Sequence, residues 1–419
     1  MNILFINTID DKGGAARMTY KLKTGLEKNG ITTSMFVKHK SLPDKNIFEV
    51  ARPNMFTKKL GAFSKKLTGR DIPAYLQYIT RIALSDDMHF FNNTNLLDSQ
   101  EFKDADIIHC HNLHGNYFNL TSLQKISKMK PVVWTQEDMW PITPHEAWIV
   151  KDETGAEKFS MEVTPHLKWN SRWFLFKAKQ HIYAHSDLHI VAACQWSMDE
   201  LENSILRDKK RYLIHHGVDE TVFTPHDKIE SRKKLGLPID KKIITFMANG
   251  GKNNEQKGWP YAAEVIRNYR DRSDVLFLCI GGNEKASDAT SGNIQYVPYL
   301  ADEMSVSLHY SASDIFLNPS LAENFGLIIA QVMACGTPIV TFPVGIANEA
   351  IQHKKTGYIA NYQDAQDLAR GITYVLGLSE HAIEEIRKAT RQTVVENYTL
   401  DIMLKKHIQL YEKLLQAKK

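Results

Sequence analysis

The chain has 419 residues, a length that suits two domains of roughly 200 residues each. Hydrophobic residues make up 43% and charged residues 24%, which excludes long disorder, and a net charge of +4 gives no reason to expect a nucleic-acid partner. Four scattered cysteines suggest neither a disulfide framework nor a zinc site, and no run of about eighteen apolar residues occurs, so we expect a cytoplasmic protein that is neither secreted nor membrane-spanning.

The first residues predict a strand, a glycine turn and a helix. Residues 2–7 form an apolar run typical of a buried strand, and a helical pattern follows the turn. In the turn, Gly13, Gly14 and Arg17 stand where backbone N–H groups at a helix start can hold a phosphate or lie near an acceptor. The GxGxxG fingerprint is absent, so this turn is a weak signal by itself.

Residues 38–81 are rich in lysine and arginine, interleaved with large apolar side chains. The basic residues cluster most tightly at Lys58, Lys59, Lys65, Lys66 and Arg70. This pattern fits an amphipathic helix on an anionic membrane surface, where each basic residue contributes about 1 kcal/mol. A solvated helix that covers a sheet is an equally good interpretation.

The strand predicted at residues 106–110 runs into a loop that holds three histidines, His109, His111 and His114. A metal site is a minor alternative here, because strand alternation separates the first two histidines from Cys110 and no carboxylate is spaced to complete a ligand set. The preceding Asp-Ala-Asp formally matches a D-x-D metal motif. It stands before a strand, however, and predicts a solvated turn.

The strand predicted at residues 131–135 leads into Glu137 and Asp138. Four tryptophans follow, at Trp140, Trp148, Trp169 and Trp173. Exposed aromatic residues can stack on sugar rings, although such residues more often belong to the core.

A second glycine-rich turn follows the strand predicted at residues 242–247. It holds Gly250, Gly251, Lys252 and Lys257, and a helix is predicted to begin directly after it. Lysine side chains at such a turn supply point charges that suit a diphosphate.

Residues 315–336 predict a strand, a loop and a short helix that together suit a sugar nucleotide. The helix follows Gly326 and ends at Gly336, so its first N–H groups face the loop and can bind an anion or a sugar hydroxyl. Glu323 stands in this loop, and Gln331 lies further along the helix.

The run PSLAENFGLIIAQVMACGTPIV at residues 319–340 resembles the signature of the retaining glycosyltransferase family 4, with Glu323 as the first of the two glutamates of that signature. The histidine strand, the lysine-bearing turn and the crossover near residue 217 resemble three further motifs of this family. The chain departs from the family pattern at Glu137 for histidine, His216 for asparagine, Lys252 for arginine, Asn324 for glycine and Gln331 for glutamate.

This resemblance covers nearly the full length and implies an α/β protein of the GT-B architecture, with two Rossmann-like doubly wound domains facing a central cleft. It implies an N-terminal acceptor-binding domain at residues 1–216, onto which a C-terminal helix at residues 398–419 packs back. Residues 217–397 would form the C-terminal domain that binds the nucleotide-sugar donor.

The resemblance also implies a retaining, metal-independent transfer without a cofactor, from a nucleotide diphosphate sugar to a hydroxyl of a glycan or lipid-linked glycan, in bacterial surface polysaccharide assembly. Catalytic roles would fall on His111, Glu137, Lys252, Lys257 and Glu323. Donor binding would fall on Gly250, Gly251, Val297, Tyr299, Asn324, Phe325, Gly326, Leu327 and Gln331. The acceptor or phosphate side would include Gly13, Gly14, Arg17, Asn112 and Asp138.

Two alternatives stay open, the first of them because Glu137 and Gln331 depart from the family pattern. One is a catalytically impaired GT-B protein that binds a glycan or a partner enzyme. The other is a sugar-nucleotide epimerase on the same architecture, which would need no acceptor.

Overall fold

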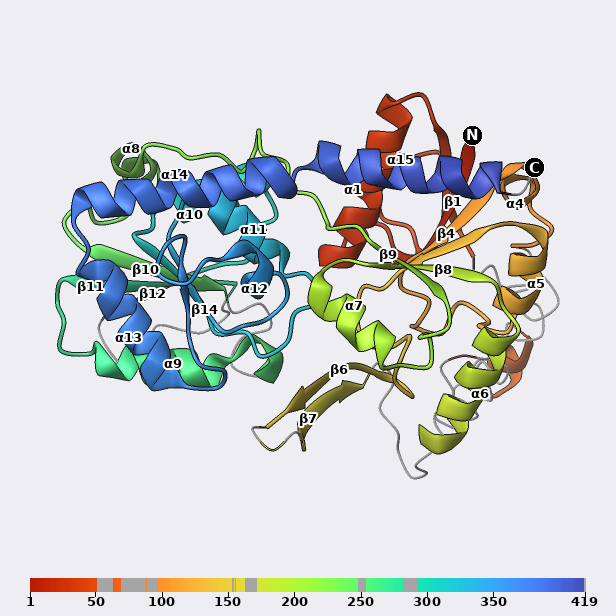
Figure 1. The fold of residues 1–419 in the computed structure, drawn as a ribbon, viewed down its shortest axis with the longest axis horizontal. Coiled ribbons are helices and arrows are strands. Elements are labelled where there is room, and N and C mark those ends of the chain that lie inside the picture. The colour runs from red at the N-terminus through yellow and green to blue at the C-terminus, as the bar shows by residue number, and fades with distance from the viewer. Residues whose placement is uncertain are drawn as a thin grey trace. The chain divides into compact units, whose positions relative to one another are not determined.

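The computed structural model describes residues 1–50, 63–68, 88, 96–152, 154, 156–162, 172–247, 254–281 and 293–417. The chain divides into two compact units, which Figure 1 shows as two α/β bodies. Unit 1 comprises Met1–Ala193, Ser197–Ile214 and Leu404–Lys419. Unit 2 comprises Cys194–Trp196 and His215–Met403.

Unit 1 is built on a seven-stranded sheet in the order β3-β2-β1-β4-β5-β8-β9, in which all neighbouring strands are parallel. The strands are β1 (Asn2–Ile9), β2 (Thr32–His39), β3 (Ile47–Glu49), β4 (Ile107–Cys110), β5 (Val132–Thr135), β8 (Leu188–Ala192) and β9 (Lys210–Leu213). The helices in this part of the chain are α1 (Gly14–Lys28), α4 (Gln100–Asp104), α5 (Ser122–Met129), α6 (Arg172–Ala184) and α7 (Gln195–Glu202). Strands β4, β5 and β8 are buried along their whole length, which explains their almost continuous apolar sequences.

Two local features of unit 1 differ from the sequence-based expectations. The strands β6 (Glu146–Lys151) and β7 (Glu157–Glu162) form a separate antiparallel hairpin that the sequence patterns did not predict. The sequence pattern predicts a short helix from Ser197 to about Leu206, whereas helix α7 begins at Gln195 and ends at Glu202.

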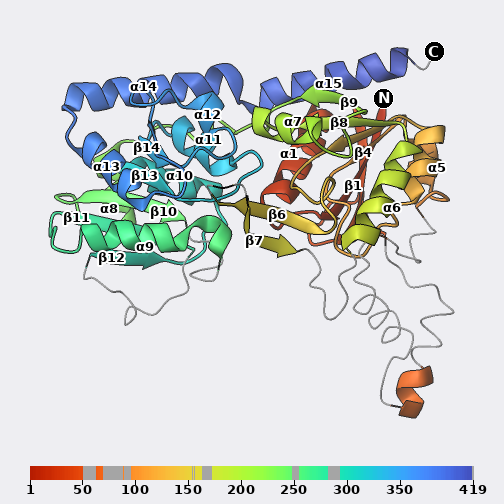
Figure 2. The same cartoon turned by 60° about the horizontal axis from the view of Figure 1, so that its bottom comes forward.

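Unit 2 is built on a six-stranded parallel sheet in the order β12-β11-β10-β13-β14-β15. The strands are β10 (Lys242–Met247), β11 (Val275–Ile280), β12 (Ile294–Val297), β13 (Ile315–Asn318), β14 (Ile339–Thr341) and β15 (Tyr358–Ile359). The helices are α8 (Lys228–Leu235), the single 3-10 turn η2 (Glu255–Lys257), α9 (Trp259–Asn268), α10 (Glu303–Ala312), α11 (Leu327–Ala334), α12 (Ala347–Ala350), α13 (Ala365–Leu376) and α14 (Glu380–Asn397). Figures 1 and 2 show α10, α11 and α14 on one side of this sheet and α9 and α13 on the other.

Each sheet is therefore doubly wound, as predicted, and each has one point where the strand order reverses. In unit 1 this switch point lies between β1 and β4, and in unit 2 it lies between β10 and β13. Ligands of open α/β sheets bind outside the carboxyl ends of the strands at such points. The topology thus directs attention to the loops after these four strands.

The last helix, α15 (Leu400–Gln416), follows unit 2 in sequence, but its residues from Leu404 onward belong to unit 1. It lies so close to α1 that a Cβ atom on Gly25 would approach the Leu404 side chain to 2.7 Å. Its Tyr411 and His407 rings lie beside His109 at the end of β4.

Of the basic stretch at residues 38–81, only residues 38–50 and 63–68 lie within the described chain. Residues 63–68 are helical, and their Phe63, Lys65, Lys66 and Leu67 side chains are exposed. Lys58, Lys59 and Arg70 lie outside the described residues, so the proposed membrane contact stays a prediction. Within the described chain, no helix combines the length and the apolar character needed to cross a bilayer.

Candidate functional site

The switch point of unit 2 brings the lysine-bearing turn against the loop that follows β13. Gly258 has a φ of 67°, and a Cβ atom on it would lie 1.8 Å from the Pro319 carbonyl oxygen. The Leu321 N–H donates to the Gln256 carbonyl at 2.7 Å, and the Gln256 side-chain amide donates to the Ala322 carbonyl at 2.8 Å. Two segments far apart in sequence are therefore joined backbone to backbone.

At this contact, the Lys257 ammonium and the Glu323 carboxylate form an ion pair with an Nζ–Oε1 distance of 2.6 Å. The two side chains are 19% and 13% exposed. Both residues were predicted as site residues from separate motifs, and the structure brings them together. Lys252, Gly250 and Gly251, from the same turn as Lys257, lie outside the described residues.

The loop leads into α11 through Gly326, which has a φ of 80° and carries no capping hydrogen bond from any described side chain. Leu327 is the first helical residue, and Gly336 follows the helix with a φ of 68°, as the sequence predicted. The first N–H groups of α11 therefore face the loop that holds Glu323. This arrangement suits an anion or a sugar hydroxyl.

The remaining predicted donor residues differ in exposure. Asn324 and Phe325 are buried, and the Ile346 N–H donates to the Phe325 carbonyl at 2.9 Å, which helps to fix the loop backbone. Gln331 is partly exposed on α11. Val297 ends the edge strand β12, two strands from β10, and Tyr299 beyond it is 54% exposed.

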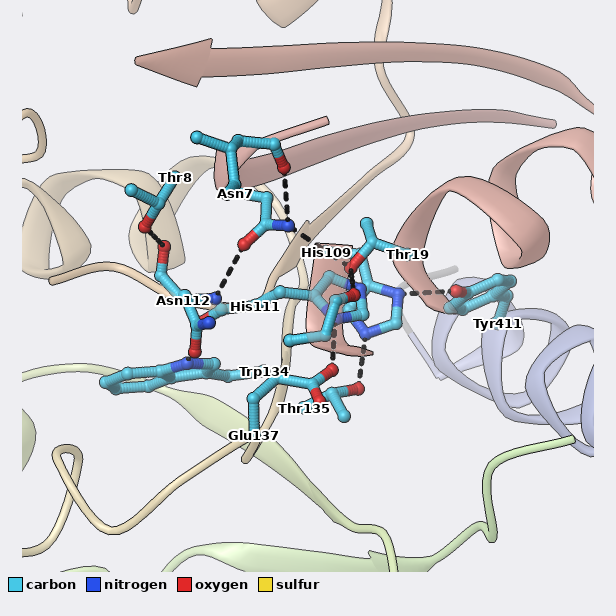
Figure 3. Close-up of polar contacts among 12 residues, drawn as sticks. Asn7, Thr8, Thr19, His109, His111, Asn112, Trp134, Thr135, Glu137 and Tyr411 are labelled. Carbon is cyan, nitrogen blue, oxygen red and sulfur yellow. Dashed lines mark hydrogen bonds and ion pairs between the residues drawn. The ribbon is translucent and has the colours of Figure 1, made fainter. Parts of the chain in front are cut away.

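The switch point of unit 1 places His111 and Glu137 beside each other (Figure 3). Figure 3 shows the His111 ring facing the Glu137 carboxylate, with an Nδ1–Oε1 distance of 2.8 Å. The two side chains are 2% and 4% exposed. A carboxylate at this position repels a nearby phosphate unless it is protonated or paired. It is paired.

The predicted residue Asn112 is held at the same place through its backbone. Its N–H donates to Asn7 Oδ1 at 3.1 Å, and the Thr8 hydroxyl donates to its carbonyl at 3.1 Å (Figure 3). The indole N–H of Trp134 donates to the His111 carbonyl at 2.7 Å. The loop after β4 is therefore anchored to both neighbouring strands, β1 and β5.

Asp138 also has a defined partner, since its Oδ2 lies 2.8 Å from His114 Nε2. Its other oxygen accepts the Trp140 N–H at 2.9 Å and caps the turn that follows. Trp140 and Trp148 are buried, whereas Trp173 is exposed, and Trp169 lies outside the described residues.

Lys179, which the sequence analysis did not single out, holds the segment from Trp140 to Thr143. Lys179 of α6 is fully buried, and its ammonium donates to the Trp140 carbonyl at 2.6 Å and to the Thr143 carbonyl at 2.9 Å. The same ammonium lies 3.6 Å from the centre of the Trp140 ring. Its position in the sequence could have indicated its burial, because Lys179 follows Leu175 by four residues and therefore shares the apolar face of its helix.

His109 lies deeper and takes a structural role. Its Nδ1 is 2.6 Å from the Tyr411 hydroxyl and its Nε2 is 2.8 Å from Thr135 Oγ1. Burial holds the pKa of His109 well below its usual range, and the nearby His111 and His407 rings add to this effect. Within the described residues, no three potential ligands gather as a metal site would require.

The glycine turn after β1 begins α1. Gly13 has a φ of 91° and Gly14 is the first helical residue; no described side chain caps this helix. The Arg17 guanidinium folds back and donates to the Asp11 carbonyl at 3.4 Å. The predicted acceptor or phosphate residues of the turn thus lie at the same switch point as His111.

Two doubly wound parallel sheets with polar side chains gathered at both switch points define the class of two-Rossmann-domain proteins to which the GT-B glycosyltransferases belong. The model of Glycosyltransferase Family 4 matches residues 12–222, and that of Glycosyl transferases group 1 matches residues 241–377. The chain belongs to Glycosyltransferase Family 4.

A relative named D-inositol 3-phosphate glycosyltransferase, from Mycobacteroides abscessus, is 27% identical to this chain over 275 residues. The match covers 60% of this chain and 58% of the relative, so the chain spans somewhat more than half of that protein. A sucrose-phosphate synthase from Thermosynechococcus elongatus has the same fold, with a TM-score of 0.66, 16% identity and 99% coverage of both chains. An Anabaena protein, Alr3699/HepE, solved in complex with UDP-glucose, gives a TM-score of 0.65 at 13% identity and covers 99% of this chain and 100% of its own. These likenesses show the GT-B fold.

Proposed function

We propose that the protein transfers a sugar from a nucleoside diphosphate sugar to a hydroxyl of an acceptor. The observation that carries this proposal is the meeting of Lys257, Glu323 and the start of α11 at the switch point of unit 2. A cation, an uncapped helix start and a hydrogen-bonding carboxylate are what a diphosphate and a sugar require. The named activity of the mycobacterial relative and the UDP-glucose bound to the Anabaena protein support the proposal.

In the proposed reaction, Lys257, Lys252 and the first N–H groups of α11 stabilise the leaving diphosphate. This is electrostatic preorganisation, which needs no metal and no side-chain nucleophile. Glu323 and the amides of residues 324–327 hold the donor sugar. The bond from the anomeric carbon to the phosphate oxygen breaks, the acceptor oxygen bonds to the same face of that carbon, and the leaving phosphate takes the acceptor proton, so configuration is retained.

The rest of the donor is assigned to the neighbouring loops. Gln331 accepts and donates hydrogen bonds to the ribose hydroxyls, without the charge-assisted bonds that a glutamate would give. We assign the nucleobase to Val297 and Tyr299, and Gly250 and Gly251 would let the backbone approach the diphosphate.

We assign the acceptor to the switch point of unit 1, with His111, Glu137, Asn112 and Asp138 as its polar side. The pairing of Glu137 with His111 supports this assignment, because a paired carboxylate repels a phosphate less than an isolated one. The proposed acceptor is a glycan or a lipid-linked glycan of a bacterial surface polysaccharide.

A phosphorylated polyol is a second candidate acceptor. The named substrate of the mycobacterial relative is one, and the start of α1 at Gly13 and Gly14, which no described side chain caps, is an arrangement that suits a phosphate. Product formation with a phosphorylated polyol, but with no glycan, would favour this candidate.

The first test is calorimetric titration of the full-length protein with UDP, GDP and ADP in the presence of EDTA. We expect one of the three to bind, because the proposed diphosphate site uses lysines and backbone N–H groups instead of a metal. Silence from all three would contradict the donor site and favour a catalytically impaired protein. Conversion of a sugar nucleotide to its epimer without an acceptor would favour the epimerase.

A further inference from the structure

The Lys257–Glu323 ion pair joins two groups to which the proposed function gives different partners. In the reaction Lys257 contacts the diphosphate and Glu323 contacts the sugar, yet here the two satisfy each other at 2.6 Å. Both side chains are largely buried, so neither would be fully solvated if its partner moved away. An unpaired carboxylate in such a place is costly.

The backbone around Glu323 is fixed by contacts that do not involve its carboxylate. The Cys194 thiol donates to the Asn324 carbonyl at 2.7 Å, and the Tyr362 hydroxyl donates to the Leu321 carbonyl at 2.7 Å. Gly345 lies so close that a Cβ atom on it would meet the Phe325 carbonyl oxygen at 2.4 Å. The loop therefore keeps Glu323 in place whatever its carboxylate binds.

Lys257, by contrast, carries its charge on a flexible four-carbon chain. Its ammonium can leave Glu323 for a nearby phosphate by rotation of that chain, without any change in the loop. A diphosphate that draws Lys257 away leaves the Glu323 carboxylate without its cation and beside new negative charge. The outcome depends on what else the ligand offers to Glu323.

We propose that Glu323 is a specificity-determining residue through which the site selects the nucleoside diphosphate sugar over the free nucleoside diphosphate. This rests on the proposed function. The sugar hydroxyls donate hydrogen bonds to Glu323 and replace the lost lysine, whereas a free diphosphate has no sugar hydroxyl that could donate to Glu323. After transfer, the departure of the sugar lets Lys257 return to Glu323, and the product diphosphate is released more readily.

The test compares the binding of free and sugar-bearing nucleotide in wild type and in Glu323→Gln. Calorimetry is performed in EDTA with whichever of UDP, GDP or ADP binds to wild type, and with its glucose conjugate. Glutamine keeps the shape of the side chain and removes the charge that competes for Lys257. We expect the free diphosphate to bind roughly tenfold more tightly to this variant, and the sugar nucleotide to lose its advantage over it.

The control is Glu230→Gln, which changes the net charge equally. Glu230 pairs with Lys233 at 2.7 Å on the exposed surface of unit 2, and we expect its replacement to leave both affinities unchanged. If Glu323→Gln does not fold, Glu323→Ser also removes the charge and takes its place. Equal or weaker binding of the free diphosphate to a folded Glu323 variant would overturn the inference and leave the donor site standing. Failure of wild type to bind any nucleotide would overturn the proposed function and this inference with it.

Discussion

At the scale of single residues, Gly258 is fixed by two separate constraints. Its φ of 67° belongs to the left-handed region, and the space where a Cβ atom would stand is occupied by the Pro319 carbonyl. Gly236, at the end of α8, has nearly the same φ of 65° but no atom within 4 Å of the corresponding position. The two glycines therefore separate the cost of the conformation from the cost of the contact.

We expect Gly258→Ala to lower the free energy of unfolding by more than about 3 kcal/mol, because the donor loop must move to admit the methyl group. Gly236→Ala should lower the free energy of unfolding only by the cost of its backbone conformation, about 1 kcal/mol. Urea unfolding of both variants measures the difference. Equal losses would mean that the Gly258–Pro319 contact carries no weight.

How far the site could be predicted also differs from residue to residue. The roles of Gly326 and Gly336 at the two ends of α11 could be predicted, because local chemistry alone decides where a short helix starts and stops. The His111–Glu137 pair was not, since its members are 26 residues apart and meet only because β4 and β5 are neighbours in the sheet. The Lys257–Glu323 pair likewise required the adjacency of β10 and β13.

At the scale of elements, α6 carries a charge into the core in order to hold a loop. The Lys179 ammonium binds two carbonyls of the segment after Asp138, and the Tyr183 hydroxyl donates to the Pro141 carbonyl at 3.0 Å. One face of α6 therefore fixes the backbone from Trp140 to Thr143. The polar groups at the unit 1 switch point depend on this support.

We expect Lys179→Met to lower the free energy of unfolding by about 2–4 kcal/mol, because methionine fills the space but leaves two buried carbonyls without their donor. Lys177→Met is the matched control, since Lys177 is an exposed residue of the same helix. Its replacement should change stability by less than about 0.5 kcal/mol. Chemical unfolding of both variants makes the comparison, and a loss of similar size in both would contradict the proposed support.

The elements themselves followed from the sequence where one pattern dominated. The buried parallel strands were readable as apolar runs, because burial on both faces removes the alternation of polar residues. The β6–β7 hairpin was not predicted. Its residues mix buried Val150 and Trp148 with charged ones.

At the scale of the whole molecule, histidines that are buried in the neutral form make the stability of the protein depend on pH. Burial lowers the pKa of His109 and His189 in unit 1 and of His309 in unit 2. The unfolded chain protonates these groups below about pH 6.5, whereas the folded chain takes up these protons only at lower pH. The free energy of unfolding should therefore fall as the pH drops below about 6.5, by at most about 1.4 kcal/mol per pH unit for each histidine.

Urea unfolding between about pH 7 and pH 5 tests this expectation. Glutamine cannot be protonated, so His109→Gln should be less stable at neutral pH, yet its stability should depend less steeply on pH than that of wild type. A slope unchanged by this replacement would show that His109 does not contribute.

The division of the chain also sets an order of events during synthesis on the ribosome. Unit 2 is nearly continuous, whereas unit 1 needs Leu404–Lys419, which are translated after unit 2. At about 5–20 residues per second, translation of the intervening His215–Met403 takes on the order of 10–40 s. During that time His109 lacks its hydrogen-bond partner Tyr411, and the α1 surface around Gly25 stays uncovered. We therefore expect chaperones to bind the nascent N-terminal half. A stop codon shortly before residue 404 should leave this half susceptible to proteolysis, although unit 2 is intact.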